Sequence, residues 1–147
     1  MTITTIDSKI SKARVRDIMV SNIVQLQIGT SPSNAIKTMS DANVGSAVVM
    51  KKTYSIDQPI YVADVAGILP ILFAVKQFIK YSDNFSIDSE IIKDDVFVDE
   101  NSLLIDIISQ PVTNQTWRLI VTSGNTRVVG FISVTDIYIY ISGVCGK

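Results

Sequence analysis

The chain has 147 residues, enough for one compact domain or two small interlocked repeats, and 47% of them are hydrophobic, which excludes a disordered chain. Thirteen basic and fourteen acidic residues give a net charge of −1, so there is no general attraction to nucleic acid or to an anionic membrane. The sequence has no histidine and a single cysteine, Cys145, which excludes an intrachain disulfide, the usual metal sites and histidine-dependent catalysis.

No stretch has the pattern of a secretion signal or of a membrane-spanning helix. Residues 1–14 are polar and lack an apolar segment, so we expect a cytoplasmic location. The most apolar run, residues 62–75, is shorter than a bilayer span and contains Asp64 and Pro70. We therefore expect a buried passage from a strand to a helix there.

The first half of the chain is predicted to contain a helical turn, a strand, a helix, two strands and a second helix. These elements are expected, in order, at residues 15–19, 23–26, 30–43, 44–50, 60–65 and 67–80. Thr30 or Ser31 can cap the first long helix, in which Pro32 is tolerated in the first turn. The strand at residues 44–50 is almost continuously apolar, which predicts burial on both faces. In the second helix Pro70 is acceptable only because it lies near the beginning.

The second half is predicted to repeat this order after a polar linker. We expect a strand, a helix and a hairpin of two strands at residues 96–98, 101–110, 117–122 and 127–132, with the hairpin turn at residues 123–126. Residues 137–141 complete the last helix, and a mobile tail is expected from residue 143. Because the halves match element by element, we predict an internal duplication with a pseudo-twofold axis and related clefts. The predicted limits are residues 15–80 for the first repeat, 81–92 for the linker and 93–142 for the second repeat.

The most distinctive stretch is the passage from the last strand into the last helix, which reads GFISVTD at residues 130–136. Ser133 can cap the helix, and Asp136 stands in its first turn, so one interpretation is a helix-capping box. The other interpretation is a ligand site. Helix N-terminal amides beside Ser133 and Thr135 suit a phosphate, whereas the carboxylate of Asp136 suits hydroxyl donors such as a ribose diol.

Several stretches of the chain resemble the CBS domain family (cystathionine β-synthase domains), whose tandem pair is often called a Bateman module. They are VRDIM at residues 15–19, NVGSAVV at 43–49, WRLIV at 117–121 and GFISVTD at 130–136, and the resemblance covers nearly all of residues 15–142. It implies an α+β fold (an α/β sandwich) of two βαββα repeats packed with pseudo-twofold symmetry. It further implies two clefts that bind adenosine-containing ligands in many members, and a regulatory module rather than an enzyme.

The resemblance also implies roles for individual residues. In ligand-bound members the acid of the last motif accepts hydrogen bonds from ribose, and its hydroxyl residue faces ribose or phosphate; these roles fall on Asp136 and on Ser133 with Thr135. Arg118 stands where many members place a phosphate-binding arginine, the alternative being a surface arginine at a strand end. The other wall of the implied site comes from the first repeat, where backbone groups would read the adenine edge. The remaining site residues are Asn22, Ile23, Val24, Val44, Gly45, Ser46 and Phe131.

The first repeat departs from the family pattern at its own strand-to-helix passage. An alignment over residues 67–73 puts Pro70 and Phe73 at the two polar positions, and an alignment around residues 61–67 puts Asp64 and Gly67 there. Neither supplies a hydroxyl and an acid, so we expect one competent cleft per chain. Trp117 stands where histidine is frequent in the family, either as an aromatic platform for a base or as an apolar plug.

We therefore expect a module that binds AMP, ADP, ATP or a related adenosine compound and passes the bound state to a regulated protein. No cofactor or metal, no catalysis and no binding to nucleic acid or membrane is expected. The alternative is a ligand-free structural dimerisation module whose clefts are plugged by apolar side chains. A homodimer is expected in either case, because members commonly associate through their helices and the last helix, at residues 137–141, is more apolar than one buried side requires.

Overall fold

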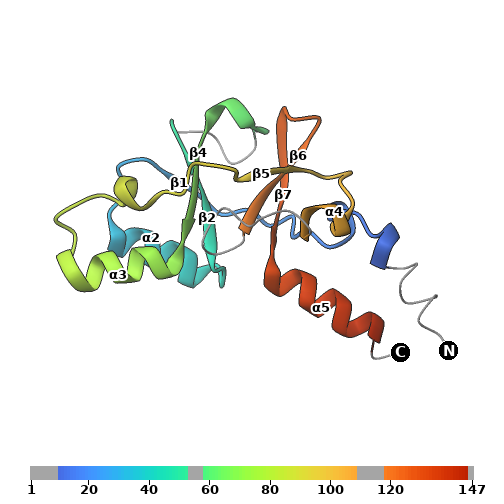
Figure 1. Cartoon of the computed structure of the whole chain (residues 1–147). Helices are drawn as coiled ribbons and strands as arrows, with labels where there is room; N and C mark the ends of the chain where they lie inside the picture. The colour runs from blue at the N-terminus through green and yellow to red at the C-terminus, as the bar shows by residue number, and fades with distance from the viewer. Residues whose placement is uncertain (1–9, 53–57, 109–117, 146–147) are drawn as a thin grey trace.

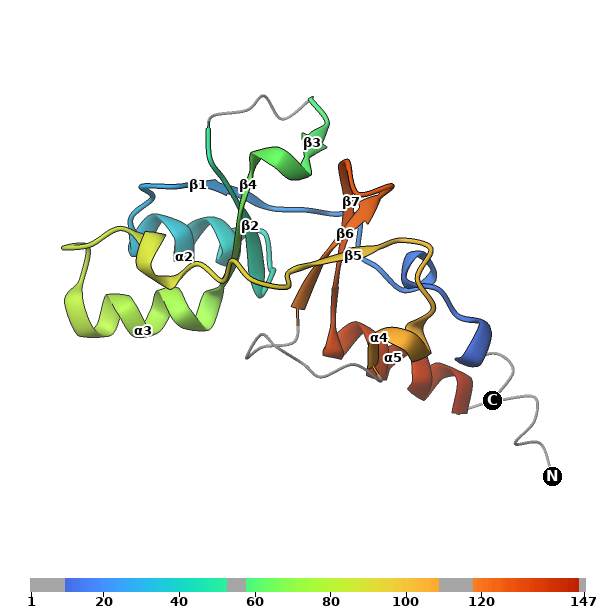
Figure 2. The ribbon, with the colours of Figure 1, turned by 45° about the horizontal axis from the view of Figure 1, so that its top comes forward.

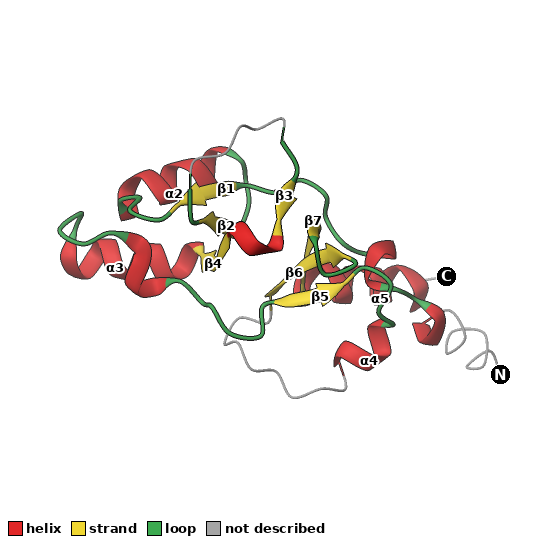
Figure 3. Cartoon of the chain, turned by 90° about the horizontal axis from the view of Figure 1, so that it is seen from above, coloured by secondary structure: helices red, strands yellow, loops and turns green. Residues whose placement is uncertain are grey.

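The computed structural model describes residues 10–52, 58–108 and 118–145 of the chain. The chain folds as two halves, each a small sheet accompanied by its own helices (Figure 1). Seen from above, the strands of both sheets lie in the middle of the molecule, with α2 and α3 at one end and α4 and α5 at the other (Figure 3). The predicted α+β fold is confirmed.

The first half contains a three-stranded sheet in the order β1-β2-β4, with β1 parallel to β2 and β2 antiparallel to β4. Its strands and helices are β1 (Gln25–Gln27), α2 (Pro32–Asp41), β2 (Ser46–Met50), β4 (Val65–Pro70) and α3 (Ile71–Tyr81). As predicted, Ser31 caps α2, because its Oγ accepts a hydrogen bond from the backbone N of Asn34 at 3.3 Å. Pro32, which has no N–H to lose, is the first residue of α2.

The second half contains a four-stranded sheet in the order β3-β7-β6-β5. Its strands and helices are β3 (Ile60–Tyr61), β5 (Phe97–Asp99), α4 (Leu104–Ile108), β6 (Arg118–Ser123), β7 (Arg127–Ser133) and α5 (Val134–Cys145). β5 is parallel to β6, and β6 is antiparallel to β7, which is the pattern of β1, β2 and β4. The last helix begins at Val134, directly after the predicted cap at Ser133, and it extends to Cys145 where a mobile tail was expected.

The limits predicted for the strand at residues 60–65 and for the helix at residues 67–80 are wrong. A 3-10 turn at Val62–Asp64 separates β3 from β4, and α3 begins only at Ile71. Pro70 lies at the end of β4 and is the N-cap residue of α3 rather than a residue of its first turn. The error has a physical cause: the buried strand β4 runs directly into the apolar first turns of α3, and a continuous apolar run has the same pattern in a strand and in a helix.

The register of the strands decides how the two repeats correspond. In the first sheet Ser46 pairs with Pro70, and in the second Arg118 pairs with Ser133. Pro70 is therefore the counterpart of Ser133, and by the same spacing Phe73 is the counterpart of Asp136. Of the two alignments left open for the first repeat, the one over residues 67–73 is correct.

The start of the described chain packs against the second half, although it precedes β1. The backbone N of Val15 donates to the carbonyl of Ser102 at 2.9 Å, and Val20 exchanges two backbone hydrogen bonds of 2.8 Å with Phe131 of β7. Figure 2 shows this segment, in blue, beside α4 and α5. The side chain of Val15 is fully buried in the core of the second half.

The end of the predicted linker makes the reciprocal contact with the first half. Ile92 exchanges two backbone hydrogen bonds of 2.9 Å with Ile68 of β4. Ile87 is fully buried in the core of the first half, and the carboxylate of Asp88 accepts a hydrogen bond of 2.7 Å from the backbone N of Gly29. Each half is thus completed by a segment that leads into the other half.

A third cluster of buried side chains joins the two sheets. Its members in the first half are Val48, Met50, Val65 and Ile68, and its members in the second half are Val96, Ile120 and Val128. Burial of this apolar surface stabilises the contact between the two halves, because all of these side chains are almost completely buried. The strand ends that carry the predicted site are fixed by this contact.

Candidate functional site

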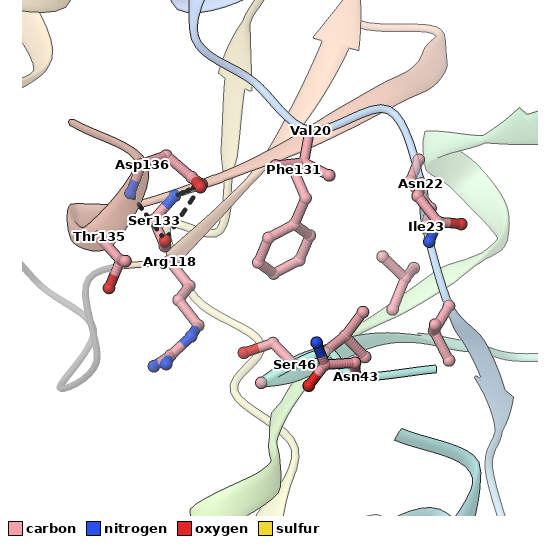
Figure 4. A pocket seen from close by; sticks show the side chains of 14 residues that line it. Val20, Asn22, Ile23, Asn43, Ser46, Arg118, Phe131, Ser133, Thr135 and Asp136 are labelled. Atoms are coloured by element: carbon pink, nitrogen blue, oxygen red, sulfur yellow. Dashed lines mark hydrogen bonds between the residues drawn. The ribbon is translucent and has the colours of Figure 1, made fainter. Parts of the chain in front are cut away.

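A cavity of about 350 Å³ lies between the two halves (Figure 4). All eleven residues of the predicted site line it, namely Asn22, Ile23, Val24, Val44, Gly45, Ser46, Arg118, Phe131, Ser133, Thr135 and Asp136. They come from the approach to β1, the start of β2, the start of β6, and the β7–α5 passage. The volume is at the small end of the range for ligand pockets, which is roughly 300–1,000 Å³.

Three further residues line the cavity and were not predicted: Val20, Asn43 and Val48. Val48 could have been predicted from the sequence. Side chains two residues apart along a strand share a face, so Val48 lies on the same face as Val44 and Ser46, which were predicted. Asn43 directly precedes these residues and has a positive φ of 56°. Val20 gave no local signal, since its position follows from the backbone bridge to Phe131.

Ser133 and Asp136 form a reciprocal capping box at the start of α5. The Oδ2 atom of Asp136 accepts hydrogen bonds from the backbone N of Ser133 at 2.8 Å and from the Ser133 hydroxyl at 3.1 Å. The backbone N of Asp136 donates in turn to Ser133 Oγ at 3.4 Å. Both residues also line the cavity, so the cap and the proposed ligand site coincide. The cap fixes the carboxylate before any ligand arrives.

Arg118 is a half-buried part of the cavity wall rather than a surface residue at a strand end. A Cβ atom built on Gly45 would lie 3.5 Å from Nη2 of Arg118, so the guanidinium lies beside the backbone of that glycine. Burial lowers the pKa of Arg118, and the nearby charge of Asp136 opposes this effect. The guanidinium stays charged at neutral pH, because its ordinary pKa is far above 7.

Away from Arg118 and the start of α5 the wall is mainly apolar, and its polar side chains are Asn22, Asn43 and Ser46. The Oγ atom of Ser46 is buried and has no hydrogen-bond partner among the described residues. Figure 4 shows Phe131 projecting between the Arg118 side of the cavity and the side formed by Asn22 and Ile23. The cavity therefore has a charged, hydroxyl-bearing end and a longer apolar side.

The equivalent passage of the first repeat lacks these groups. Pro70 offers no hydroxyl and Phe73 no carboxylate, and no side chain caps α3. Trp117, whose role was left open, lies outside the described residues, as does the predicted end of the helix at residue 110. Within the described ranges no cluster of acidic and sulfur-bearing side chains could hold a metal ion. In the same part of the chain no helix is both long and apolar enough to cross a bilayer.

Comparison with known sequences decides the family. A sequence profile of the CBS domain matches residues 15–55 and 89–143. The chain belongs to the CBS domain family. CBS domain pairs are regulatory modules and are generally not catalytic, so the fold is that of a regulatory unit. No curated protein matches this CBS pair in sequence.

Solved structures with the same fold include three CBS proteins. The CBS domain pair of protein MJ0100, in complex with 5′-methylthioadenosine and S-adenosyl-L-methionine, has a TM-score of 0.71 at 15% identity over 89% of this chain and 97% of that one. The CBS domain of a bacterial CNNM/CorC family Mg²⁺ transporter, in complex with ATP, has a TM-score of 0.74 at 14% identity over 96% and 95%. The CBS domain protein TA0289 of Thermoplasma acidophilum has a TM-score of 0.68 at 24% identity over 90% and 74%.

Proposed function

We propose that this CBS pair is a regulatory module that binds an adenosine-containing ligand, such as an adenine nucleotide, in the cavity between its repeats. One observation carries the proposal: a single cavity is lined by two regions that are far apart in sequence. They are the strand-to-helix passage of the second repeat and the segments that lead into β1 and β2 of the first. Two structures of the same fold hold adenosine compounds, one 5′-methylthioadenosine with S-adenosyl-L-methionine and the other ATP. These ligands share the adenosine group and differ in what it carries.

Asp136 is the proposed ribose-binding group. Its hydrogen bonds to Ser133 both fall on Oδ2, and Oδ1 accepts none from the described residues. A ribose diol offers two hydroxyl donors, and a carboxylate fixed by its own cap can accept from them without losing side-chain freedom on binding. Hydrogen bonds to a charged acceptor are also stronger than those between neutral groups.

The apolar side of the cavity is the proposed adenine site. Ile23, Val24, Val44 and Phe131 are partly buried there and form walls on which a flat base can pack. Backbone groups of the segments around Asn22 and Gly45 can read the edge of the base. Arg118 and the N-terminal turn of α5 lie at the other end, where a phosphate or another 5′ substituent would be placed.

Isothermal titration of the native protein with AMP, and with GMP for comparison, tests this proposal. We expect AMP to bind and Asp136→Ala to weaken its binding by roughly 1–3 kcal/mol, because the ribose hydroxyls lose a charged acceptor. Ser31→Ala is the matched control, since it removes a helix cap of the same kind on α2, away from the cavity. Failure of AMP and other adenosine compounds to bind at millimolar concentration would refute the proposal.

We also propose that the module acts as a homodimer that transmits its bound state to another protein. The observation that favours association is the exposed apolar surface of the two equivalent helices. Leu72 and Ile79 of α3, and Val134, Tyr138 and Ile139 of α5, each expose more than half of their side chains. Exposed apolar side chains gathered on a helix commonly mark an interface. Dimerisation without a ligand remains the alternative function.

A further inference from the structure

We infer that the cavity selects adenosine compounds carrying no more than one phosphate, so that AMP binds more tightly than ADP or ATP. This inference rests on the proposed function, since it names the ligand class of the same site. It follows from the number and position of the charges around the cavity, which can compensate one phosphate and no more.

The described part of the cavity wall contains one positive and one negative side chain. Among its fourteen lining residues Arg118 is the only cation and Asp136 the only anion, so the wall has no net charge. Residues 109–117, which precede Arg118 in the sequence, contain no Lys or Arg that could add a second positive charge. A polyphosphate would therefore meet one guanidinium and a carboxylate of its own sign.

One phosphate can be satisfied at the charged end. A phosphate monoester has a charge of about −1.5 to −2 at neutral pH. Arg118 supplies one full positive charge, and the N-terminus of the twelve-residue helix α5 supplies about half a charge more. The two are close to each other, because Arg118 pairs with Ser133 at the last residue of β7, immediately before α5.

Ser46 adds a neutral group of the right kind at this end. Its hydroxyl is buried, has no partner among the described residues, and lies on the side of the cavity nearest Arg118 (Figure 4). A hydroxyl can donate to a phosphate oxygen but contributes no charge. It improves the fit of the first phosphate without compensating a second. Each additional phosphate thus brings negative charge that no further cation balances, in a region where Asp136 repels it.

The test is calorimetric titration of the whole protein with adenosine, AMP, ADP and ATP, at one ionic strength and with EDTA present so that no metal ion neutralises the phosphates. We expect AMP to bind about tenfold more tightly than adenosine, because it gains charge-assisted bonds to Arg118. We expect the affinity to fall from AMP to ADP and again to ATP. If ADP or ATP binds as tightly as AMP, the inference is wrong although the proposed function stands. If none of the four binds, both are wrong.

Two variants test the charge argument directly. Arg118→Gln should reduce the affinity for AMP to that for adenosine while adenosine itself binds as before; an equal loss for both ligands would contradict a phosphate-binding role. Thr135→Lys adds a cation to the cavity wall and should raise the affinity for ATP relative to AMP. Ser142→Lys adds the same charge on an exposed part of α5 outside the cavity and should leave the ratio unchanged. An unchanged ratio in Thr135→Lys would overturn the inference.

Discussion

Gly130 lies so close to the backbone of Val20 that a Cβ atom built on it would be 3.0 Å from the Val20 carbonyl oxygen. The counterpart in the first repeat, Gly67, lies in the same way against the carbonyl of Ile92, where a Cβ would overlap the oxygen. Each glycine thus makes room for the segment that crosses from the opposite half. The pseudo-twofold relation between the repeats extends to these individual contacts.

Substitution of either glycine by alanine is expected to destabilise the protein. We expect Gly130→Ala to lower the free energy of unfolding by about 1–3 kcal/mol, because the added methyl overpacks a buried backbone contact. Gly67→Ala should lower the free energy of unfolding by more. The methyl added at Gly67 meets the rigid carbonyl oxygen of Ile92, whereas the atom nearest to a methyl at Gly130 belongs to the flexible side chain of Met19. Urea unfolding monitored by circular dichroism measures both.

Gly143→Ala provides the control for these two variants. A Cβ on Gly143, which lies within α5, would have no atom within 4 Å. Alanine is also the better helix former, so this change should leave stability unaltered or raise it by about 0.5–1 kcal/mol. Equal effects at all three glycines would contradict the role assigned to Gly67 and Gly130.

The capping box of α5 should contribute to stability even without a ligand. Ser133→Ala removes the hydroxyl that accepts from the backbone N of Asp136, and we expect the free energy of unfolding to fall by about 1 kcal/mol. Thr135 lies in the first turn of the same helix but makes no hydrogen bond in the cap, so Thr135→Ala should have little effect. Thermal melting in the absence of nucleotide distinguishes the two. A Ser133→Ala protein as stable as the native one would show that the cap contributes nothing.

The N-terminal segment should stabilise the second repeat rather than the first. Val15→Ala removes two methyl groups that are fully buried beside Leu104 and Ile107, and we expect a loss of about 1–3 kcal/mol. Hydrogen exchange should show amides of β6 and β7 losing protection while those of α2 change less. The exposed Val134 is the matched site, where alanine should have no such effect. Faster exchange confined to α2 would contradict this assignment.

If the protein dimerises through α3 and α5, charged substitutions on the exposed faces of these helices should prevent dimerisation. Ile79 of α3 is 80% exposed and Tyr138 of α5 is 59% exposed. We expect a dimer for the native protein and a monomer for Ile79→Glu combined with Tyr138→Glu, because a buried unpaired carboxylate is costly. Light scattering coupled to size-exclusion chromatography measures the mass directly. A native protein that elutes as a monomer would count against the proposed homodimer.

Much of the fold could be predicted because its local signals agree with its tertiary structure. The cap at Ser31, the hairpin turn before Arg127 and the buried strand ending at Met50 are all encoded by a few neighbouring residues. The limits around Pro70 could not be predicted, because the buried strand β4 and the apolar first turns of α3 form one uninterrupted apolar run in the sequence. The repeat limits at residues 15–80, 81–92 and 93–142 remain predictions.

The residues that line the cavity were grouped for a different reason. Ser133 and Asp136 alone fit a capping box equally well, and the structure shows that they form one. Their grouping with Asn22 and Gly45 came from the resemblance to the CBS family, since nothing local brings together residues so far apart in sequence. Val20 was missed because its place at the cavity depends on a backbone bridge between opposite ends of the chain.

The crossing of segments between the halves has a consequence for synthesis on the ribosome. Val20 is made well before its partner Phe131, which lies in β7 and follows the strands of the first sheet in the sequence. The segment that holds Val20 therefore stays undocked until β7 has left the exit tunnel, whereas Ile92 can complete the first sheet sooner. Because N-terminal parts of a chain are made first, the cavity, which needs residues of both halves, is assembled only after β7 has been made. A truncated nascent chain would hold a closed first sheet and no ligand site.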